Sequence, residues 1–423
     1  MKKLIKKFFG SDYTLSVAVK IASAAIGIVC SAFCTRFLGV KYKGDYNYIA
    51  QIANILVLVL NMGIYQSYSY NYKKYGPSIT QKYINICFCQ FVILLGVSIL
   101  LIVITRDMLL SMILILVPFN VLKLQYGNIV LIEKIRLNFF LTVFNTVFLT
   151  VSYAILYFCA SPSIVYVVGL TVIVDIITVV FYIFGLKVVP KAWDIDIAFL
   201  KSVLLFGLIP MLSGLLSTIN YHIDIIFLKQ IGLPEELSYY SLATNIINYV
   251  WMIPDAFKTV LFSRSGKKFD KQNTLFSSQV SSLFIIVCFA GFAVFGKFIL
   301  CFLYGDEFVY SYGVTLLLIV GAFSMSFYKL TGVVLVSQGR RIAHFVTLAA
   351  SAITNVILNI ILIPRMGMYG AAIASVCSYS ICGLALLLYF CKLYGMNAVQ
   401  FMVPSRETVK ALISGLRSKD RKE

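Results

Sequence analysis

Apolar runs long enough to cross a lipid bilayer recur along the whole chain. A helix needs about 20 residues to span the hydrocarbon layer, and breaks made of charged residues, glycine and proline divide the chain into twelve such runs. They cover residues 13–37, 46–70, 82–105, 108–131, 138–160, 164–187, 201–229, 238–262, 275–303, 312–337, 343–363 and 369–394. Each run is continuous rather than alternating, which favours helices over barrel strands. The sequence therefore predicts an all-α integral membrane protein with twelve transmembrane helices.

Composition excludes several other classes. Only 13% of the residues are charged, against about 25% in soluble domains, so a water-soluble core cannot accommodate the chain. The net charge of +19 would suit nucleic acid, but the basic residues lie between the apolar runs and form no single stripe. Ten cysteines and two histidines show no metal-ligand spacing. We therefore expect no nucleic acid, metal or cofactor.

The basic residues predict the direction of the helices. If the N-terminus is cytoplasmic, 25 lysines and arginines fall on the cytoplasmic side and six on the other, as the positive-inside rule requires. Both termini are then cytoplasmic. Residues 398–423 are predicted to form a basic tail in which Ser405 caps a short amphipathic helix on the inner leaflet; a disordered basic tail is the alternative.

Weak internal matches indicate a repeat of six helices. A shift of 193 residues superposes Gly39, Tyr46 and Ala50 on the corresponding residues of the second half, and a shift of 204 does so for Leu131 and Arg136. Two halves with six helices each enter the membrane from the same side. The sequence thus predicts a lobe over residues 1–195 and a lobe over residues 196–397, which face each other around a central cavity.

Four lysines lie inside the predicted helices, in the half nearer the cytoplasm. They are Lys20, Lys123, Lys258 and Lys329. An ionised group in hydrocarbon needs a partner, a wet cavity or a route to the interface. The lysines could line a cavity that binds a pyrophosphate. Alternatively, their side chains could extend along the lipid to the inner interface.

Three aspartates also lie inside predicted helices, namely Asp175, Asp224 and Asp255. Carboxylates at such depth can carry a coupling proton or sodium ion. Asp255 and Lys258 are three residues apart, so we expect them to neutralise each other on one helix face. Asp175 and Asp224 lack a partner nearby in sequence, which makes them the better candidates for ion coupling.

Several short motifs lie within and between the predicted helices. They are Arg36-Phe-Leu-Gly39 with Gly44 and Tyr46, Ser337-Gln-Gly-Arg340, Asn355 with Asn359, Ile363-Pro364, Gly367 through Ala374, and Asp224 followed by Tyr239-Tyr240. In their order and spacing these motifs resemble the O-antigen and capsular polysaccharide flippases, the polysaccharide-transporter branch of the multidrug/oligosaccharidyl-lipid/polysaccharide exporter superfamily. Leu237 departs from the repeat, because it stands at the counterpart of Gly44.

The resemblance implies a function. Such proteins move an undecaprenyl-pyrophosphate-linked oligosaccharide across the bacterial inner membrane by alternating access, coupled to an ion. It also implies roles for Arg36 in substrate translocation and Asp224 in ion coupling. The expected partners are the lipid-linked oligosaccharide, membrane lipids and other membrane proteins of polysaccharide assembly.

Two other functions are open at this stage. A small-molecule or drug antiporter of the same superfamily would share the twelve helices, although its cavity should favour acidic groups. A membrane glycan polymerase or glycosyltransferase would be an enzyme, but it should carry a large outer loop or an acid/base cluster. The chain also lacks the GxxxxGK[ST] phosphate loop, so ATP is not the expected energy source. A transporter is predicted rather than an enzyme.

Overall fold

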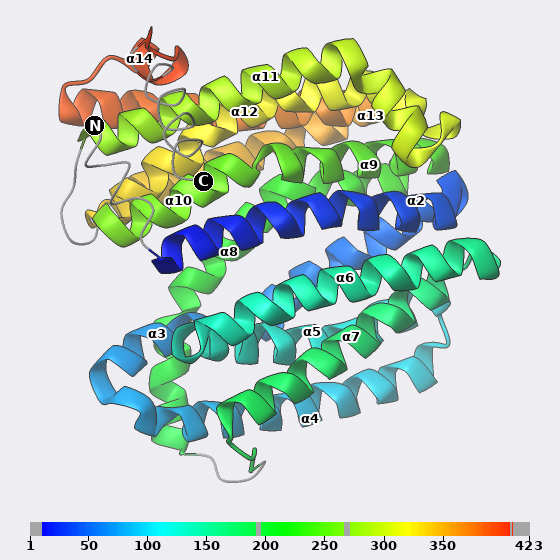
Figure 1. The fold of residues 1–423 in the computed structure, drawn as a ribbon, viewed down its shortest axis with the longest axis vertical. Coiled ribbons are helices and arrows are strands. Elements are labelled where there is room, and N and C mark those ends of the chain that lie inside the picture. Colours follow the sequence, from blue (N-terminus) through cyan, green and yellow to red (C-terminus); the bar gives the residue numbers. More distant parts are fainter. Residues whose placement is uncertain (1–10, 192–195, 266–270, 407, 409–423) are drawn as a thin grey trace, which may run out of the picture. The chain divides into compact units, whose positions relative to one another are not determined.

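A computed structural model describes residues 11–191, 196–265, 271–406 and 408 of the chain. All regular structure among these residues is helical (Figure 1). Internal contacts divide the chain into two compact units. The described residues between 25 and 226 form what we call the N-terminal unit, and those between 227 and 408, together with residues 11–24, form the C-terminal unit.

The N-terminal unit is built around α5. This helix packs against α3, α4, α6 and α7. Helix α5 begins after Asp107, whose side chain accepts a hydrogen bond from the backbone N–H of Leu110 at 2.7 Å, and α7 begins after Ser163, which caps in the same way. The helices of this unit are α2 (Ser11–Leu60, from residue 25), α3 (Ile64–Tyr75), η1 (Gly76–Ile79), α4 (Thr80–Thr105), α5 (Met108–Glu133), α6 (Ile135–Cys159), α7 (Ile164–Leu186) and α8 (Ile197–Ile231, to residue 226).

The C-terminal unit is built around α12 in the same manner. This helix packs against α9, α10, α11 and α13, and most of its side chains are buried. The helices of this unit are α9 (Pro234–Val250), α10 (Met252–Ser265), α11 (Lys271–Tyr304), η2 (Asp306–Tyr310), α12 (Ser311–Ser337), α13 (Arg341–Tyr394) and α14 (Ala398–Met402).

Nine helical stretches of the described chain are long and apolar enough to cross a membrane, so the prediction of an all-α, multi-pass membrane protein is confirmed. The number is below twelve partly because two of these stretches, in α2 and α13, each contain two helices joined at a kink. Helices α2 and α13 each contain two predicted spans, which are separated by Gly39 and Gly367 with φ of 62° and 54°. The predicted span over residues 238–262 is instead two short helices, α9 and α10, which meet at Trp251.

The second half of α13 is capped from another helix. Glu236, in the first turn of α9, accepts a hydrogen bond from the backbone N–H of Met368 at 3.2 Å. Gly367 makes this approach possible, because a Cβ at this position would overlap the Glu236 carboxylate. A carboxylate is favourable at the start of a helix, where backbone N–H groups lack partners.

The break between α2 and α3 is the main irregularity in the N-terminal unit. Met62 and Gly63 both have positive φ, and the backbone of Gly63 contacts that of Gly207 in α8 so closely that neither position has room for a Cβ. Side-chain amides replace the lost helical hydrogen bonds: Gln90 donates to the carbonyl of Leu60 at 2.5 Å, and Asn128 donates to that of Tyr65 at 2.6 Å. Backbone N–H and C=O groups inside a membrane have no water to bind, so they need hydrogen-bond partners within the protein.

The predicted lobes 1–195 and 196–397 follow the helix count, whereas the observed units follow internal contacts and place most of α8 with the first half. The lobes therefore stay a prediction. Of the predicted tail, α14 and Ser405 lie among the described residues. Ser405 accepts a hydrogen bond from the N–H of Thr408 at 3.1 Å, as a helix cap does. Residues 409–423 lie outside the described residues.

Candidate functional site

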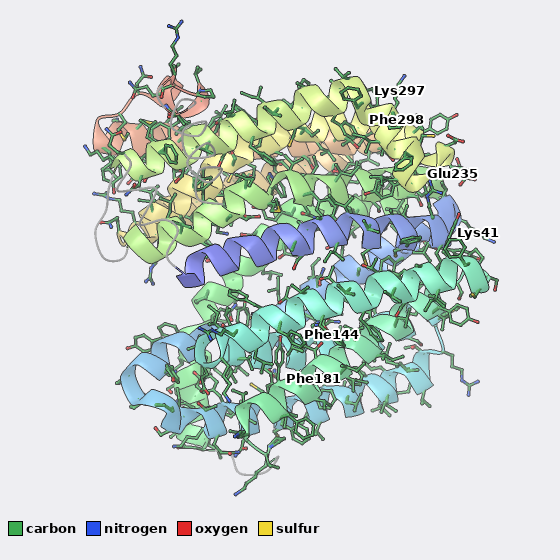
Figure 2. All side chains as sticks on the ribbon, viewed as in Figure 1. Lys41, Phe144, Phe181, Glu235, Lys297 and Phe298 are labelled. Atoms are coloured by element: carbon green, nitrogen blue, oxygen red, sulfur yellow. The ribbon has the colours of Figure 1, made fainter. Side chains whose placement is uncertain are left out.

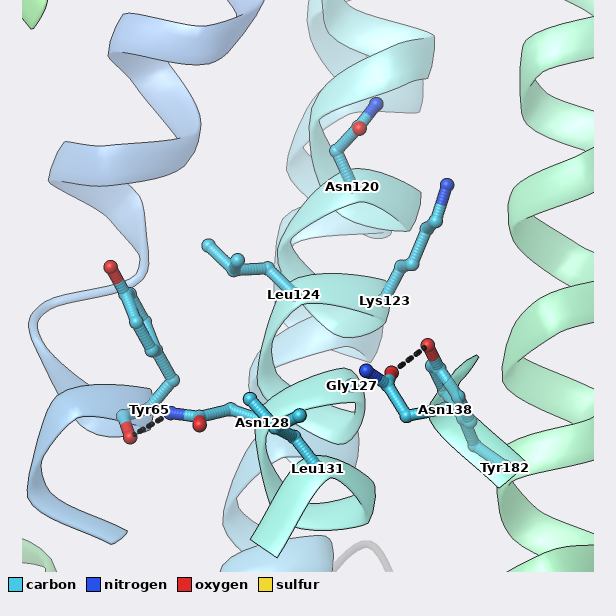
Figure 3. Close-up of a pocket in the computed structure, with 9 residues that line it drawn as sticks. All are labelled: Tyr65, Asn120, Lys123, Leu124, Gly127, Asn128, Leu131, Asn138 and Tyr182. Carbon is cyan, nitrogen blue, oxygen red and sulfur yellow. Dashed lines mark hydrogen bonds between the residues drawn. The ribbon is translucent and has the colours of Figure 1, made fainter. Parts of the chain in front are cut away.

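An open cavity lies at the surface of the N-terminal unit, against one face of α5. Its volume is about 420 Å³. The α5 residues that line it are three or four positions apart, which places them on one side of the helix. The lining residues, all drawn in Figure 3, are Tyr65, Asn120, Lys123, Leu124, Gly127, Asn128, Leu131, Asn138 and Tyr182.

Hydrogen bonds hold the polar lining in place. The Tyr182 hydroxyl of α7 donates to Asn138 Oδ1 of α6 at 3.1 Å, and the Asn128 amide is fixed on the backbone of Tyr65 (Figure 3). Gly127 leaves room for the tyrosine, since a Cβ there would lie 3.3 Å from the Tyr182 hydroxyl. The cavity thus presents oriented hydroxyl and amide groups together with one ammonium group.

That ammonium belongs to Lys123, which forms an ion pair with Asp175 of α7. The distance between Nζ and Oδ1 is 2.5 Å. The two side chains differ in exposure: 34% for Lys123 and 1% for Asp175. The carboxylate is therefore buried between helices, while the lysine reaches the cavity with part of its charge still available. Burial of a carboxylate is tolerable here because the lysine compensates its charge.

Polar groups of α6 and α7 extend this pair. Asn145 of α6 donates through Nδ2 to Thr178 Oγ1 at 2.9 Å, and Thr178 lies one turn beyond Asp175 on α7. The second carboxylate oxygen of Asp175 and the amide oxygen of Asn145 are buried without a hydrogen-bond partner among the described residues. Buried oxygens in proteins are rarely left in this state.

The C-terminal unit contains a second pair, which corrects one prediction. Lys329 of α12 binds both oxygens of Asp255 in α10, at 2.9 and 3.0 Å. Lys329 also lies over the Trp251 ring, with Nζ 4.1 Å from the centroid. The expected pairing of Asp255 with Lys258 is wrong. Asp255 takes its partner from a neighbouring helix, because α10 packs directly against α12.

The other predicted residues have varied surroundings. Lys258 and Arg36 are exposed. Exposure of Lys258 suits the alternative that its side chain extends to the interface. Asp224 is buried in α8, and its Oδ1 accepts the backbone N–H of Ile225 at 3.0 Å. The backbone of Lys20 belongs to α2, but its side chain lies outside the described part of the structure.

Sequence reasoning missed the neutral groups of the site. Asn120 and Asn128 stand on the same face of α5 as Lys123, and Asn138, Asn145 and Tyr182 complete the polar surroundings from α6 and α7. The sequence did hold a signal, because an asparagine inside an apolar run is costly unless its amide is hydrogen-bonded. The helical spacing of Asn120 and Asn128 relative to Lys123 could have indicated a shared polar face.

This arrangement suits a phosphate-bearing ligand. An ammonium group beside amide N–H donors can bind phosphate oxygens by charge-assisted hydrogen bonds. We found no match to a protein-family model and no match among curated proteins.

Solved structures do resemble the chain. The lipid II flippase MurJ in an inward closed conformation matches with a TM-score of 0.74 and 14% identity, over 96% of this chain and 93% of that protein. An inward-facing MATE multidrug resistance transporter of the MOP superfamily matches with a TM-score of 0.64 and 13% identity, over 90% and 94%. A MOP superfamily transporter from Pyrococcus furiosus matches with a TM-score of 0.59 and 12% identity, over 90% and 96%.

These matches span nearly the full length of every chain compared. Such long alignments at low identity establish a common fold without establishing a common substrate. The chain therefore has the fold of the MOP superfamily of transporters.

Proposed function

We propose that the protein is a flippase for a lipid-linked oligosaccharide whose pyrophosphate group makes the substrate anionic. The substrate is an undecaprenyl-pyrophosphate-linked repeat unit of an O-antigen or capsule type, and it moves from the cytoplasmic to the outer face of a bacterial inner membrane. Transport proceeds by alternating access, and other membrane proteins of polysaccharide assembly supply and receive the substrate.

The single observation that carries this proposal is the lysine in the cavity of the N-terminal unit. Lys123 reaches a cavity lined by Asn120 and Asn138, so its ammonium and amide N–H groups of these asparagines can share the oxygens of one phosphate. A pocket for an organic cation would instead place a carboxylate at the surface, but here Asp175 is almost fully buried behind the lysine. The similarity of fold to a lipid II flippase supports the same class of substrate.

The remaining predicted residues keep proposed roles. Lys20, Arg36, Lys258 and Lys329 are candidates for contact with the substrate along its path. Asp224 and Asp175, both buried, are candidates for ion coupling, whereas Asp255 is half-exposed and paired. A buried carboxylate can exchange a bound cation between two conformations.

One observation favours a second candidate, a small-molecule antiporter. The Asp255 side chain is 45% exposed while its partner Lys329 is buried, so in the C-terminal unit the accessible group is an anion. A carboxylate is the group expected in a site for organic cations. Such an antiporter would exchange a cationic compound for protons or sodium ions, and it would not move a pyrophosphate lipid.

Transport by the purified full-length protein in proteoliposomes tests the proposal. The substrate is an undecaprenyl-pyrophosphate oligosaccharide with a fluorescent sugar, and a membrane-impermeant quencher reports its movement between leaflets. We expect transport by the wild type and a loss of at least about tenfold in Lys123→Ala, which corresponds to one charge-assisted contact. Lys20→Ala and Lys329→Ala are measured in parallel.

Lys297→Ala is the matched control. Lys297 is an exposed lysine of α11 (labelled in Figure 2) whose ammonium lies over the Tyr312 ring, so its loss should leave transport unchanged. The double variant Lys123→Ala/Asp175→Asn removes both charges of the pair and separates a folding defect from loss of the substrate contact. Absence of transport by the wild type, combined with exchange of organic cations, would favour the antiporter.

A further inference from the structure

The hydrogen bonds that hold the cavity amides also determine which groups those amides offer to a ligand. Asn120 donates through Nδ2 to the carbonyl of Leu116 at 3.0 Å, one turn earlier on α5. Asn128 donates in the same way to the carbonyl of Tyr65 in α3 at 2.6 Å. A backbone carbonyl can only accept, so each side chain must turn its nitrogen toward it. The amide oxygens, Oδ1 of each asparagine, are therefore left for another partner.

Both oxygens are open to a ligand. Asn120 and Asn128 line the cavity (Figure 3), and neither Oδ1 accepts a hydrogen bond from any residue that the structure describes. In this they differ from the amide oxygens of Gln125 and Asn145, which the described chain encloses completely. The cavity thus contains two accessible hydrogen-bond acceptors whose orientation is fixed.

Donors lie beside these acceptors. The Lys123 ammonium carries three N–H groups, of which the neighbouring carboxylate takes one. Asn138 uses its Oδ1 to accept from the Tyr182 hydroxyl, so its Nδ2 is the group left to donate into the cavity that it lines. The two acceptors are eight residues apart on α5, which is about 12 Å along the helix. The polar groups therefore extend well beyond a single phosphate, whose oxygens surround one atom.

A phosphate alone does not complement this pattern. Its ionised oxygens only accept hydrogen bonds, so they suit Lys123 and the amide N–H groups but are repelled by two carbonyl oxygens. A hydroxyl group donates as well as accepts, and a ring that bears several hydroxyls next to a phosphate would satisfy both kinds of group. The class of ligand that combines these features is a sugar phosphate.

Apolar groups of the lining suit the remaining surface of a sugar ring. Leu124 and Leu131 lie one turn from the two asparagines on the same face of α5. Gly127 lies between them and has no side chain, so the middle of this face stays open. The C–H groups of a ring can pack against the two leucines while its hydroxyls reach the amides, as is usual in ligand sites that combine apolar lining with a few polar groups.

We infer that the cavity binds the phosphate together with the sugar attached to it, and that Oδ1 of Asn120 and Oδ1 of Asn128 accept hydrogen bonds from hydroxyl or acetamido N–H groups of that sugar. The inference rests on the proposed function and extends it. Lys123 holds the phosphate of the lipid carrier, and the two asparagines distinguish a carrier that bears a glycan from one without it. Acceptors left without a donor make the bare carrier the weaker ligand.

Soluble ligands test the cavity without any lipid or transport step. The purified full-length protein in detergent is titrated with glucose 1-phosphate and with cyclohexyl phosphate, and saturation-transfer difference NMR gives a dissociation constant for each. Both ligands have a six-membered ring and a phosphate ester, but only the first has hydroxyl groups. We expect glucose 1-phosphate to bind at least about tenfold more tightly, because one net hydrogen bond contributes about fivefold and two acceptors are present.

Three variants assign the preference to named groups. Asn120→Leu removes one acceptor, and its own hydrogen bond lies within α5, so the midpoint of thermal unfolding should be kept. The preference should fall about fivefold, with binding of cyclohexyl phosphate unchanged within about twofold. Lys123→Ala should weaken both ligands alike and keep the preference. Asn54→Leu is the matched control, because Asn54 is exposed on α2 and its amide bonds to Gln51 of its own helix; it should behave as the wild type.

The outcomes separate the inference from the proposed function. Equal affinities for the two ligands, or a preference that Asn120→Leu leaves unchanged, overturn the sugar contact but keep the phosphate site that the flippase needs. Binding of neither ligand overturns the inference and also counts against the flippase. A preference that depends on Asn120, in a protein that does not move the undecaprenyl-pyrophosphate oligosaccharide in proteoliposomes, would support the sugar contact and count against the flippase alone.

Discussion

At the scale of residues, the two lysine–carboxylate pairs bury opposite partners. In the N-terminal unit the carboxylate of Asp175 is 1% exposed and Lys123 is 34% exposed, whereas in the C-terminal unit Lys329 is 7% exposed and Asp255 is 45% exposed. Removing the exposed member of a pair leaves a charge inside the protein, but removing the buried member leaves a charge that water can reach. The two pairs should therefore respond to substitution in opposite ways.

For the first pair, Lys123→Ala should destabilise the protein more than Asp175→Asn does. Loss of the lysine leaves a buried carboxylate that costs about 3 kcal/mol, a value at the low end of the range because Lys123 is partly solvated. Thermal unfolding in detergent, followed by tryptophan fluorescence, gives the order of the two midpoints. The double variant Lys123→Ala/Asp175→Asn should recover much of the loss, and the opposite order would contradict the burial of Asp175.

For the second pair the order reverses. Asp255→Asn leaves the Lys329 ammonium buried without its carboxylate and should cost about 2 kcal/mol, since the Trp251 ring retains part of the attraction. Lys329→Met fills the same volume without charge and should cost less than about 1 kcal/mol. The midpoints of thermal unfolding of the two variants are compared in the same measurement. Equal losses would show that burial does not decide this pair.

Individual buried charges could be recognised from sequence, but their partners could not. Lys123 and Asp175 stand out because ionisable residues are rare inside apolar runs. Their contact joins residues 52 positions apart, so it exists only once α5 packs against α7. The local pairing expected for Asp255 failed for the same reason: a neighbouring helix offered Lys329 at closer range than the next turn of α10 offered Lys258.

At the scale of elements, the apolar runs and most of the joints between them were predictable, whereas two breaks inside runs were not. Charged residues, glycine and proline divide the sequence next to Gly39 and Gly367, where the structure has non-helical backbone and a kink. The runs 46–70 and 238–262, by contrast, are each interrupted by a break that their apolar sequence does not announce. The break at Gly63 depends on contact with Gly207, which no local pattern reveals.

The contact of Gly63 with Gly207 yields a prediction about the break between α2 and α3, which packs on α8. Gly63→Ala should destabilise the N-terminal unit by more than about 2 kcal/mol, because the new Cβ meets the Gly207 backbone and φ is positive. Gly96→Ala is the matched control: its Cβ would meet nothing within 4 Å, and alanine favours the helix by up to about 1 kcal/mol. Thermal unfolding compares the two. Equal midpoints would show that the backbones of Gly63 and Gly207 do not meet.

At the scale of the whole molecule, each unit is organised around the helix that carries its lysine. Lys123 lies on α5 and Lys329 on α12, and each of these helices packs against four others of its own unit. The positions differ by 206 residues, close to the shift of 204 that relates the ends of the same predicted spans. A central helix is the one whose polar groups touch most neighbours, so a charge there can influence the packing of its unit. The six-helix repeat stays a prediction. Such a repeat would place Lys123 and Lys329 at equivalent positions of the two units.

The direction of the chain in the membrane is the prediction that affects every other assignment. With 25 basic residues on one side and six on the other, the positive-inside rule places both termini in the cytoplasm.

Green fluorescent protein fused after Glu423 should then fluoresce, because it folds poorly after export. Alkaline phosphatase fused after Ser161, between α6 and α7, should be active, because it requires the oxidising outer side. A phosphatase fusion after Lys187, at the opposite end of α7, is the matched control and should be inactive. The reverse pattern would place the tail and the inner-leaflet lysines on the outside, and the substrate would then have to be loaded from the other face of the membrane.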